Sequence, residues 1–171
     1  MTRKTRQMRG SGEETYSGRV ERIDRIDREL LALLLDDGRA TYQELGRRVR
    51  LSANTVAERV RRLRASGVIR GYRAELNLEA FGRGMDMVSD IRLREGMNRR
   101  AFEEQLHEVP QVVAAMRVTG EYDYQLRMAC TDAREFEHVV DRLKAELGVR
   151  ELRSRLLLHE VPLGPERLLE H

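Results

Sequence analysis

Cysteine is nearly absent from this sequence of 171 residues, in which Cys130 stands alone. A single cysteine excludes an intramolecular disulfide and a zinc site built on cysteine. Of the four histidines, His107, His138 and His159 show none of the paired spacing that binds a metal, so we expect no metal site. Glycine-rich phosphate loops, nucleophile elbows and clustered carboxylate pairs are lacking as well, and we expect no cofactor. These absences disfavour an enzyme.

Long hydrophobic runs are also missing. No stretch approaches the roughly 18 apolar residues of a membrane-spanning helix, and no signal-peptide pattern opens the chain. We therefore expect a cytoplasmic protein with no membrane partner. Lysine is scarce too, since only Lys4 and Lys144 occur, and arginine carries nearly all the positive charge. Arginine suits bidentate contacts to phosphate and guanine, although a GC-rich genome produces the same bias.

The charge that is present is unevenly distributed. Residues 1–72 carry 17 basic and 10 acidic side chains, a net charge of +7, whereas residues 73–171 carry 15 and 19, a net charge of −4. The chain as a whole has a net charge of only +3. An excess of positive charge confined to the first half predicts a polyanionic partner for that half.

Two short amphipathic helices follow each other closely in the first half. The first, TYQELGRRV, begins with Thr41 and has Glu44 three residues later, which is the pattern of a capping box. The second, SANTVAERVRRL, begins with Ser52 as its N-cap. Because only Arg50 and Leu51 separate them, the two helices must cross steeply, as in a helix-turn-helix.

Flanking segments complete the predicted domain. Apolar residues from Ile26 to Leu34 recur at helical spacing, and Gly38 suits the end of that helix. After the second short helix, apolar and polar residues alternate in VIRGYRAEL, which predicts an extended wing or a strand. Residues 20–72 are thus predicted to form a winged helix-turn-helix. Residues 1–19 are polar and rich in arginine and glycine, which predicts a disordered basic arm.

The second helix of the pair offers a polar row beside its apolar stripe. Thr55, Arg59 and Arg62 each precede a member of the stripe by one residue, so they share one side of the helix. Alternatively, this row is simply a solvent-exposed helix surface that does not contact DNA. On the flank, Asn54 and Glu58 can meet adenine or cytosine edges, or simply bond to the helix surface. The predicted DNA-binding residues are Ser52, Asn54, Thr55, Glu58, Arg59 and Arg62.

The second half has a different pattern. Residues 73–83 form a predicted linker, residues 84–162 a second domain, and residues 163–171 a C-terminal tail. Alternating and helical segments follow in the order strand, helix, strand, strand, helix, strand: 87–94, 98–109, 112–120, 122–130, 136–143 and 151–161. This order predicts a ferredoxin-like βαββαβ domain, so the fold class of the chain is α+β.

One face of the predicted sheet is left without helices. It needs a cover, most simply a second copy of the chain. The residues that we expect on this open face are Val88, Val113, Met116, Leu126 and Leu156.

From Ile23 to Pro162 the sequence resembles the Lrp/AsnC, or feast/famine, family of transcriptional regulators. The segments that carry the resemblance are IDRIDRELLALLLDDGRATYQELGRRVRLSANTVAERVRRLRASGVIRGYRAELN, FG, VPQVVAAMRVTGEYDYQLRMAC and GVRELRSRLLLHEV. The resemblance implies a sequence-specific, nucleoid-associated regulator of double-stranded DNA. It also implies homodimers that form through the sheets and assemble further to octamers. A small effector, usually an amino acid, would bind between subunits.

The resemblance also implies where the effector binds. The segment VTGEYD matches the effector loop of the family, with Gly120 and Asp123 at its most characteristic positions. The sequence departs from the family pattern at three places. Arg50 replaces the usual turn glycine, and Arg117 and Arg155 bring charge that favours a polar or acidic amino acid. For Asp123, the alternative is a turn carboxylate that accepts a backbone N–H. The implied effector-binding residues are Arg117, Thr119, Gly120, Tyr122, Asp123, Ala133, Ser154 and Arg155.

One enzyme has the same two-domain plan. Sirohaem decarboxylases with these two domains bind a tetrapyrrole through histidine and arginine of the second domain. A tetrapyrrole-binding enzyme of this type is therefore the alternative function. The arginine-rich second helix favours the regulator.

Overall fold

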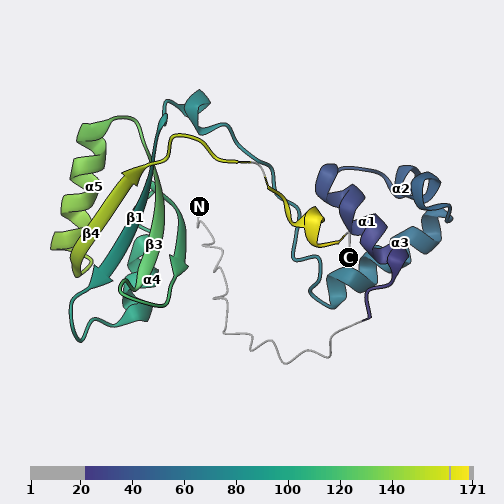
Figure 1. Ribbon diagram of the computed structural model, residues 1–171, viewed down its shortest axis with the longest axis horizontal. Coiled ribbons are helices and arrows are strands. Elements are labelled where there is room, and N and C mark those ends of the chain that lie inside the picture. The colour runs from purple at the N-terminus through teal and green to yellow at the C-terminus, as the bar shows by residue number, and fades with distance from the viewer. Residues whose placement is uncertain (1–21, 162, 170–171) are drawn as a thin grey trace, which may run out of the picture. The chain divides into compact units, whose positions relative to one another are not determined.

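The computed structural model describes residues 22–161 and 163–169, so the predicted basic arm lies outside the described residues (Figure 1). The described chain divides into two compact units. One unit contains residues 22–74 together with 163–169, and the other contains residues 75–161. Residues 163–169 of the predicted tail thus group with the N-terminal unit.

The N-terminal unit contains the α-helices α1 (Arg25–Asp36), α2 (Tyr42–Val49) and α3 (Ala53–Ala65). The structure confirms both predicted caps, because the side chain of Thr41 accepts from the Glu44 N–H and that of Ser52 from the Thr55 N–H. A capping box that was not predicted begins α1. In it, the side chains of Asp24 and Asp27 each accept the backbone N–H of the other residue. Each helix thus begins where a side-chain oxygen satisfies free N–H groups.

The turn between α2 and α3 is as tight as the sequence predicts. Arg50 adopts a left-handed conformation with φ of 58°, which favours glycine over residues with a side chain. A Cβ added at Gly46 would lie 2.6 Å from the carbonyl oxygen of Leu51, so only glycine lets the turn approach α2 this closely. The core that holds the helices together consists of the buried residues Leu30, Leu45, Val49, Val56 and Val60.

The predicted wing is an extended segment. Residues 70–77 have no regular secondary structure, and the four strands described in this chain all belong to the other unit. Next to the wing, the short helix η2 (Pro165–Leu168) of the C-terminal segment packs near α1. A groove of about 760 Å³ runs between them, lined by residues that include Leu34, Tyr72 and Leu168.

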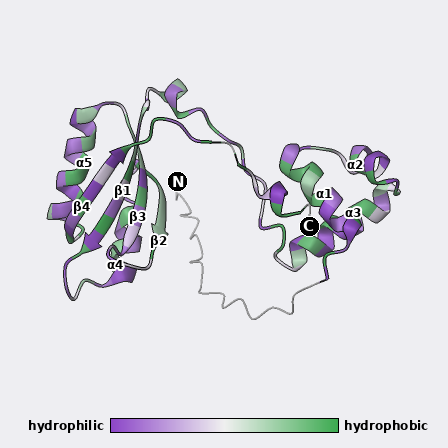
Figure 2. Ribbon diagram, viewed as in Figure 1, coloured by the Kyte–Doolittle hydropathy of each residue, from purple (hydrophilic) through white to green (hydrophobic). Residues whose placement is uncertain are grey.

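The second unit has the predicted ferredoxin-like order. After the short helix η1 (Leu78–Phe81), the elements are β1 (Met85–Leu93), α4 (Arg99–Leu106), β2 (Val112–Arg117), β3 (Tyr124–Cys130), α5 (Ala133–Ala145) and β4 (Val149–Leu156). The strands form one antiparallel sheet in the order β2-β3-β1-β4. Both helices pack on one face, through a core that includes Phe102, Leu126 and Leu143. Along α5 and the strands, hydrophobic residues alternate with hydrophilic ones (Figure 2).

The open face of the sheet differs from the prediction. Leu126 is fully buried in the core under the helices, and Leu156 lies opposite Met87, which also faces that core. These two residues are therefore wrongly assigned to the open face. That face instead contains ion pairs, among them Arg127 with Asp86 and Arg155 with Asp90. The described residues include no helix long and apolar enough to cross a membrane.

Candidate DNA-binding and effector sites

Ser52 and Thr55 lie at the N-terminus of α3. The Ser52 hydroxyl accepts the Thr55 N–H at 3.2 Å, and the two hydroxyl oxygens are 2.8 Å apart. Both side chains are exposed. The free N–H groups and the positive end of the helix dipole make this end suitable for a DNA phosphate.

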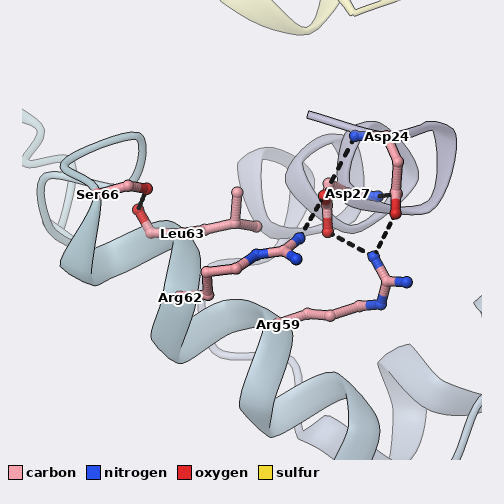
Figure 3. A network of polar contacts seen from close by, with 6 residues as sticks. All are labelled: Asp24, Asp27, Arg59, Arg62, Leu63 and Ser66. Atoms are coloured by element: carbon pink, nitrogen blue, oxygen red, sulfur yellow. Dashed lines mark hydrogen bonds and ion pairs between the residues drawn. The ribbon is translucent and has the colours of Figure 1, made fainter. Parts of the chain in front are cut away.

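Arg59 and Arg62 turn toward α1, as Figure 3 shows. Nη1 of Arg59 lies 2.6 Å from Oδ2 of Asp24 and 2.9 Å from Oδ1 of Asp27. Nη2 of Arg62 lies 2.6 Å from Oδ2 of Asp27. The side chains predicted to meet DNA are therefore engaged with two carboxylates of the same chain.

Burial explains why Asp27 needs these partners. The side chain of Asp27 is fully buried, and a buried carboxylate is costly unless paired charges and hydrogen bonds compensate its lost hydration. The hydrogen bond from Arg59, followed by the N–H of Asp27, lowers the pKa of Asp24. The same bond with Asp24 raises the pKa of Arg59. Asp24 and Arg59 thus remain ionised near neutral pH.

A different row of α3 points outward. Asn54, Glu58 and Arg61 follow at i, i+4 and i+7, opposite the buried stripe, and all three are exposed. Arg61 makes no hydrogen bond or ion pair with the residues that the structure describes. The sequence analysis missed it, although the helical period continued from Asn54 leads directly to this position.

The effector loop borders a hollow of about 520 Å³ at the end of the sheet. Five of the eight predicted effector residues line it: Arg117, Thr119, Gly120, Tyr122 and Asp123. Arg99, the first residue of α4, also lines the hollow and was not predicted. Its position depends on packing between α4 and the loop, which no local sequence pattern reveals.

Asp123 braces this loop. Its Oδ2 accepts the Leu93 N–H at 3.0 Å, and its Oδ1 lies 3.3 Å from Nη2 of Arg99. The N–H of Leu93 is the main cause that lowers the pKa of Asp123, so the carboxylate is ionised at neutral pH. Arg92 braces the loop from another side, because its guanidinium lies 5.3 Å from the ring centre of Tyr122.

The other three predicted effector residues lie elsewhere in the domain. Ala133 begins α5. Ser154 shares a hydrogen bond of 2.7 Å with Ser89, and Arg155 pairs with Asp90 on the open face of the sheet. Neighbouring residues of a strand point to opposite faces, so Ser154 and Arg155 cannot both face one site of a single chain. Within the described part of the chain, no group of three or more His, Cys, Asp or Glu side chains can hold a metal.

Comparison with known families matches both units. Residues 23–70 match the winged helix-turn-helix DNA-binding family. Residues 87–165 match the Lrp/AsnC ligand binding domain.

Relatives with these two domains are transcriptional regulators, and they give no support to the enzyme alternative. The leucine-responsive regulatory protein of Rhizobium meliloti is 38% identical over 148 residues, which cover 84% of this chain and 93% of that protein. The Bkd operon transcriptional regulator of Pseudomonas aeruginosa is 33% identical over 144 residues, or 82% of this chain and 94% of that protein.

Solved structures agree with this. A transcriptional regulator of Neisseria meningitidis in complex with L-methionine has a TM-score of 0.77 and 31% identity, covering 86% of this chain and 99% of that one. A feast or famine regulatory protein of Mycobacterium tuberculosis, also complexed with L-methionine, has a TM-score of 0.75 and 34% identity, covering 81% and 94%. With its capped helix-turn-helix and ferredoxin-like domain, this chain belongs to the Lrp/AsnC family of DNA-binding transcriptional regulators, which are not enzymes.

Proposed function

We propose that this regulator recognises operator DNA through the outward row of α3, and that an amino acid bound at the effector loop modulates its assembly or DNA binding. The observation that carries the DNA proposal is the exposed row Asn54, Glu58 and Arg61, opposite the buried stripe. In helix-turn-helix proteins, the second helix enters the major groove and its outer side chains contact base edges.

Each side chain of the row suits a base edge. Arginine donates two bonds to guanine, asparagine pairs with adenine, and glutamate accepts from cytosine. Ser52 and Thr55, at the start of the same helix, would contact phosphate. In this proposal Arg59 and Arg62 keep their places on the DNA-binding surface, but they hold α3 on α1 through Asp27.

Operator binding by the Arg61→Ala variant tests this proposal. We expect a loss of about 1–3 kcal/mol in binding free energy, with relaxed preference at one base position if Arg61 contacts a base. Electrophoretic shifts over a salt series measure it. Arg25→Ala removes the same charge from the exposed start of α1 and serves as the control. Equal operator affinity of wild type and Arg61→Ala, with an intact fold, would contradict the assignment.

The effector proposal depends on the charges around the hollow. Arg117 and Arg99 supply cations for a carboxylate, and the ionised Asp123 supplies an acceptor for an ammonium group. The two cations exceed the single carboxylate among these residues, which favours a polar or acidic amino acid over an aliphatic one. Ala133, Ser154 and Arg155 would contribute only from other subunits of an assembly.

The assembly that we propose is a homodimer formed through the open sheet faces, with larger species up to an octamer. Two copies would place two recognition helices on successive turns of the DNA, about 34 Å apart. We further propose that the regulator acts in the cytoplasm, associated with the nucleoid.

A further inference from the structure

Helix α3, the proposed recognition helix, carries positive charges that carboxylates of the same chain neutralise. Among the described residues, the carboxylates of Asp24 and Asp27 balance the charges of Arg59 and Arg62 at this edge of α3. An arginine that contacts a DNA phosphate gains affinity by releasing counterions from the DNA. A nearby carboxylate opposes that gain because it competes with the phosphate for the same guanidinium.

The two carboxylates differ in their surroundings. The side chain of Asp27 is 0% exposed and accepts from both arginines, so its removal would take away a bond that ties each of them to α1. The side chain of Asp24 is 48% exposed and lies just before the first residue of α1. Asp27 is therefore needed for the fold, whereas the charge of Asp24 adjoins solvent.

The geometry of Arg59 leaves room for a second partner. Its described bonds to Asp24 and Asp27 both use Nη1 (Figure 3). Its side chain is 23% exposed, so it is not sealed inside the unit. A phosphate at this edge would meet Arg59 together with the carboxylate that already binds it.

We propose that Asp24 is a positioning residue that limits DNA affinity: it holds Arg59 against α1 and competes with a DNA phosphate for its guanidinium. The inference rests on DNA binding by α3, which it refines. Because the limit is electrostatic, it acts on all DNA sequences alike. The operator preference set by base contacts is therefore left unchanged.

Asp24→Asn tests the proposal, since asparagine remains a good N-cap and only the charge is lost. Binding of the full-length variant to operator and to unrelated duplexes is measured over a salt series. We expect tighter binding to both at low salt. The slope of log affinity against log salt should become steeper by about one unit, so that the gain shrinks about fourfold between about 50 and 200 mM salt.

Two controls make the result specific. Glu29→Gln removes the same charge from α1 at a residue that pairs with Arg25, and it should leave the slope unchanged. The double variant Asp24→Asn with Arg59→Gln should lose the gain. Equal slopes in wild type and Asp24→Asn, or a gain that survives loss of Arg59, would overturn the proposal while leaving DNA binding itself intact. Should Asp24→Asn lower the melting temperature, Asp24→Ser keeps the cap and repeats the test.

Discussion

Glu135 joins three segments of the second unit, residues 75–161, which is called the sensing domain below. It accepts from the side chain of Gln111 and from the N–H of Thr131, each at 2.7 Å, and pairs with Arg83 at 3.3 Å. The bond from Gln111 is the largest cause, followed by the Thr131 N–H, and together they lower the pKa of Glu135 to about 2. A carboxylate with a depressed pKa stabilises the fold only where it is ionised.

Glu135→Gln should therefore make the domain less stable at neutral pH. The stabilisation by Glu135 is present above its usual pKa of 4.5 and is lost as pH falls toward about 2. Urea unfolding of wild type and variant between these limits measures the difference, which should shrink steadily with acid. Glu137→Gln alters an exposed carboxylate of the same helix and is the control. A difference that is independent of pH would contradict this account.

The effector site gives a second prediction for single residues. Arg117→Gln should weaken amino-acid binding by removing a cation for the effector carboxylate. Asp123→Asn should weaken it by removing the acceptor charge, while an oxygen remains for the Leu93 N–H. Calorimetric titration of polar and acidic amino acids into the three proteins measures this, with DNA binding in the absence of effector as the control. Unchanged binding to Asp123→Asn would show that the carboxylate only braces the loop.

The elements themselves follow largely from local sequence. The caps at Thr41 and Ser52 are decided within a few residues, and the structure confirms them. The left-handed conformation of Arg50 is a finding of the structure, in the tight turn that the sequence predicted. The turn of Arg59 toward α1 is different, because Asp27 lies 32 residues earlier in the chain. The helical period shows which side chains share a face, but it does not show which neighbour covers that face.

The prediction of which strand residues lie on the open face fails for a related reason. The register shifts between Val112 and Ala114 in β2, and again between Arg92 and Leu93 in β1. The irregularity in β2 interrupts the alternation of its side chains, and the sequence alone cannot locate it, whereas the buried positions of β1 alternate without interruption as far as Leu93. The sequence could have placed Leu126 in the core, because Leu126 alternates with Tyr124 and Met128 in one apolar row that must face the helices. The effector loop was predicted from the resemblance alone, and only packing brings Arg99 to it.

Arg50→Gly tests the turn between α2 and α3. A left-handed residue with a side chain is strained by about 1–2 kcal/mol, and glycine removes the strain at some cost in unfolded-state entropy. We expect the free energy of unfolding to rise by about 0.5–1 kcal/mol, measured by chemical denaturation. Arg48→Gly, inside α2, should instead destabilise the unit by about 1 kcal/mol. A loss of stability in Arg50→Gly would mean that the Arg50 side chain itself stabilises the turn.

At the scale of the whole molecule, the open sheet face should decide assembly. We expect light scattering to show a dimer at sub-micromolar concentration and larger species above it. Arg155→Glu replaces the partner of Asp90 by a second acidic group on the open face and should shift the equilibrium toward monomer. Arg134→Glu, on the exposed side of α5, is the control. A monomer at every concentration of wild type would rule out the proposed interface.

The C-terminal segment has a consequence for how the protein is made. Residues 163–169 belong to the same unit as α1, so the sequence of the sensing domain is inserted within that of the DNA-binding unit. On the ribosome, α1 to α3 emerge first, but η2 becomes available only after all four strands have been synthesised. The unit that begins folding first is therefore completed last, once the sensing domain has left the exit tunnel.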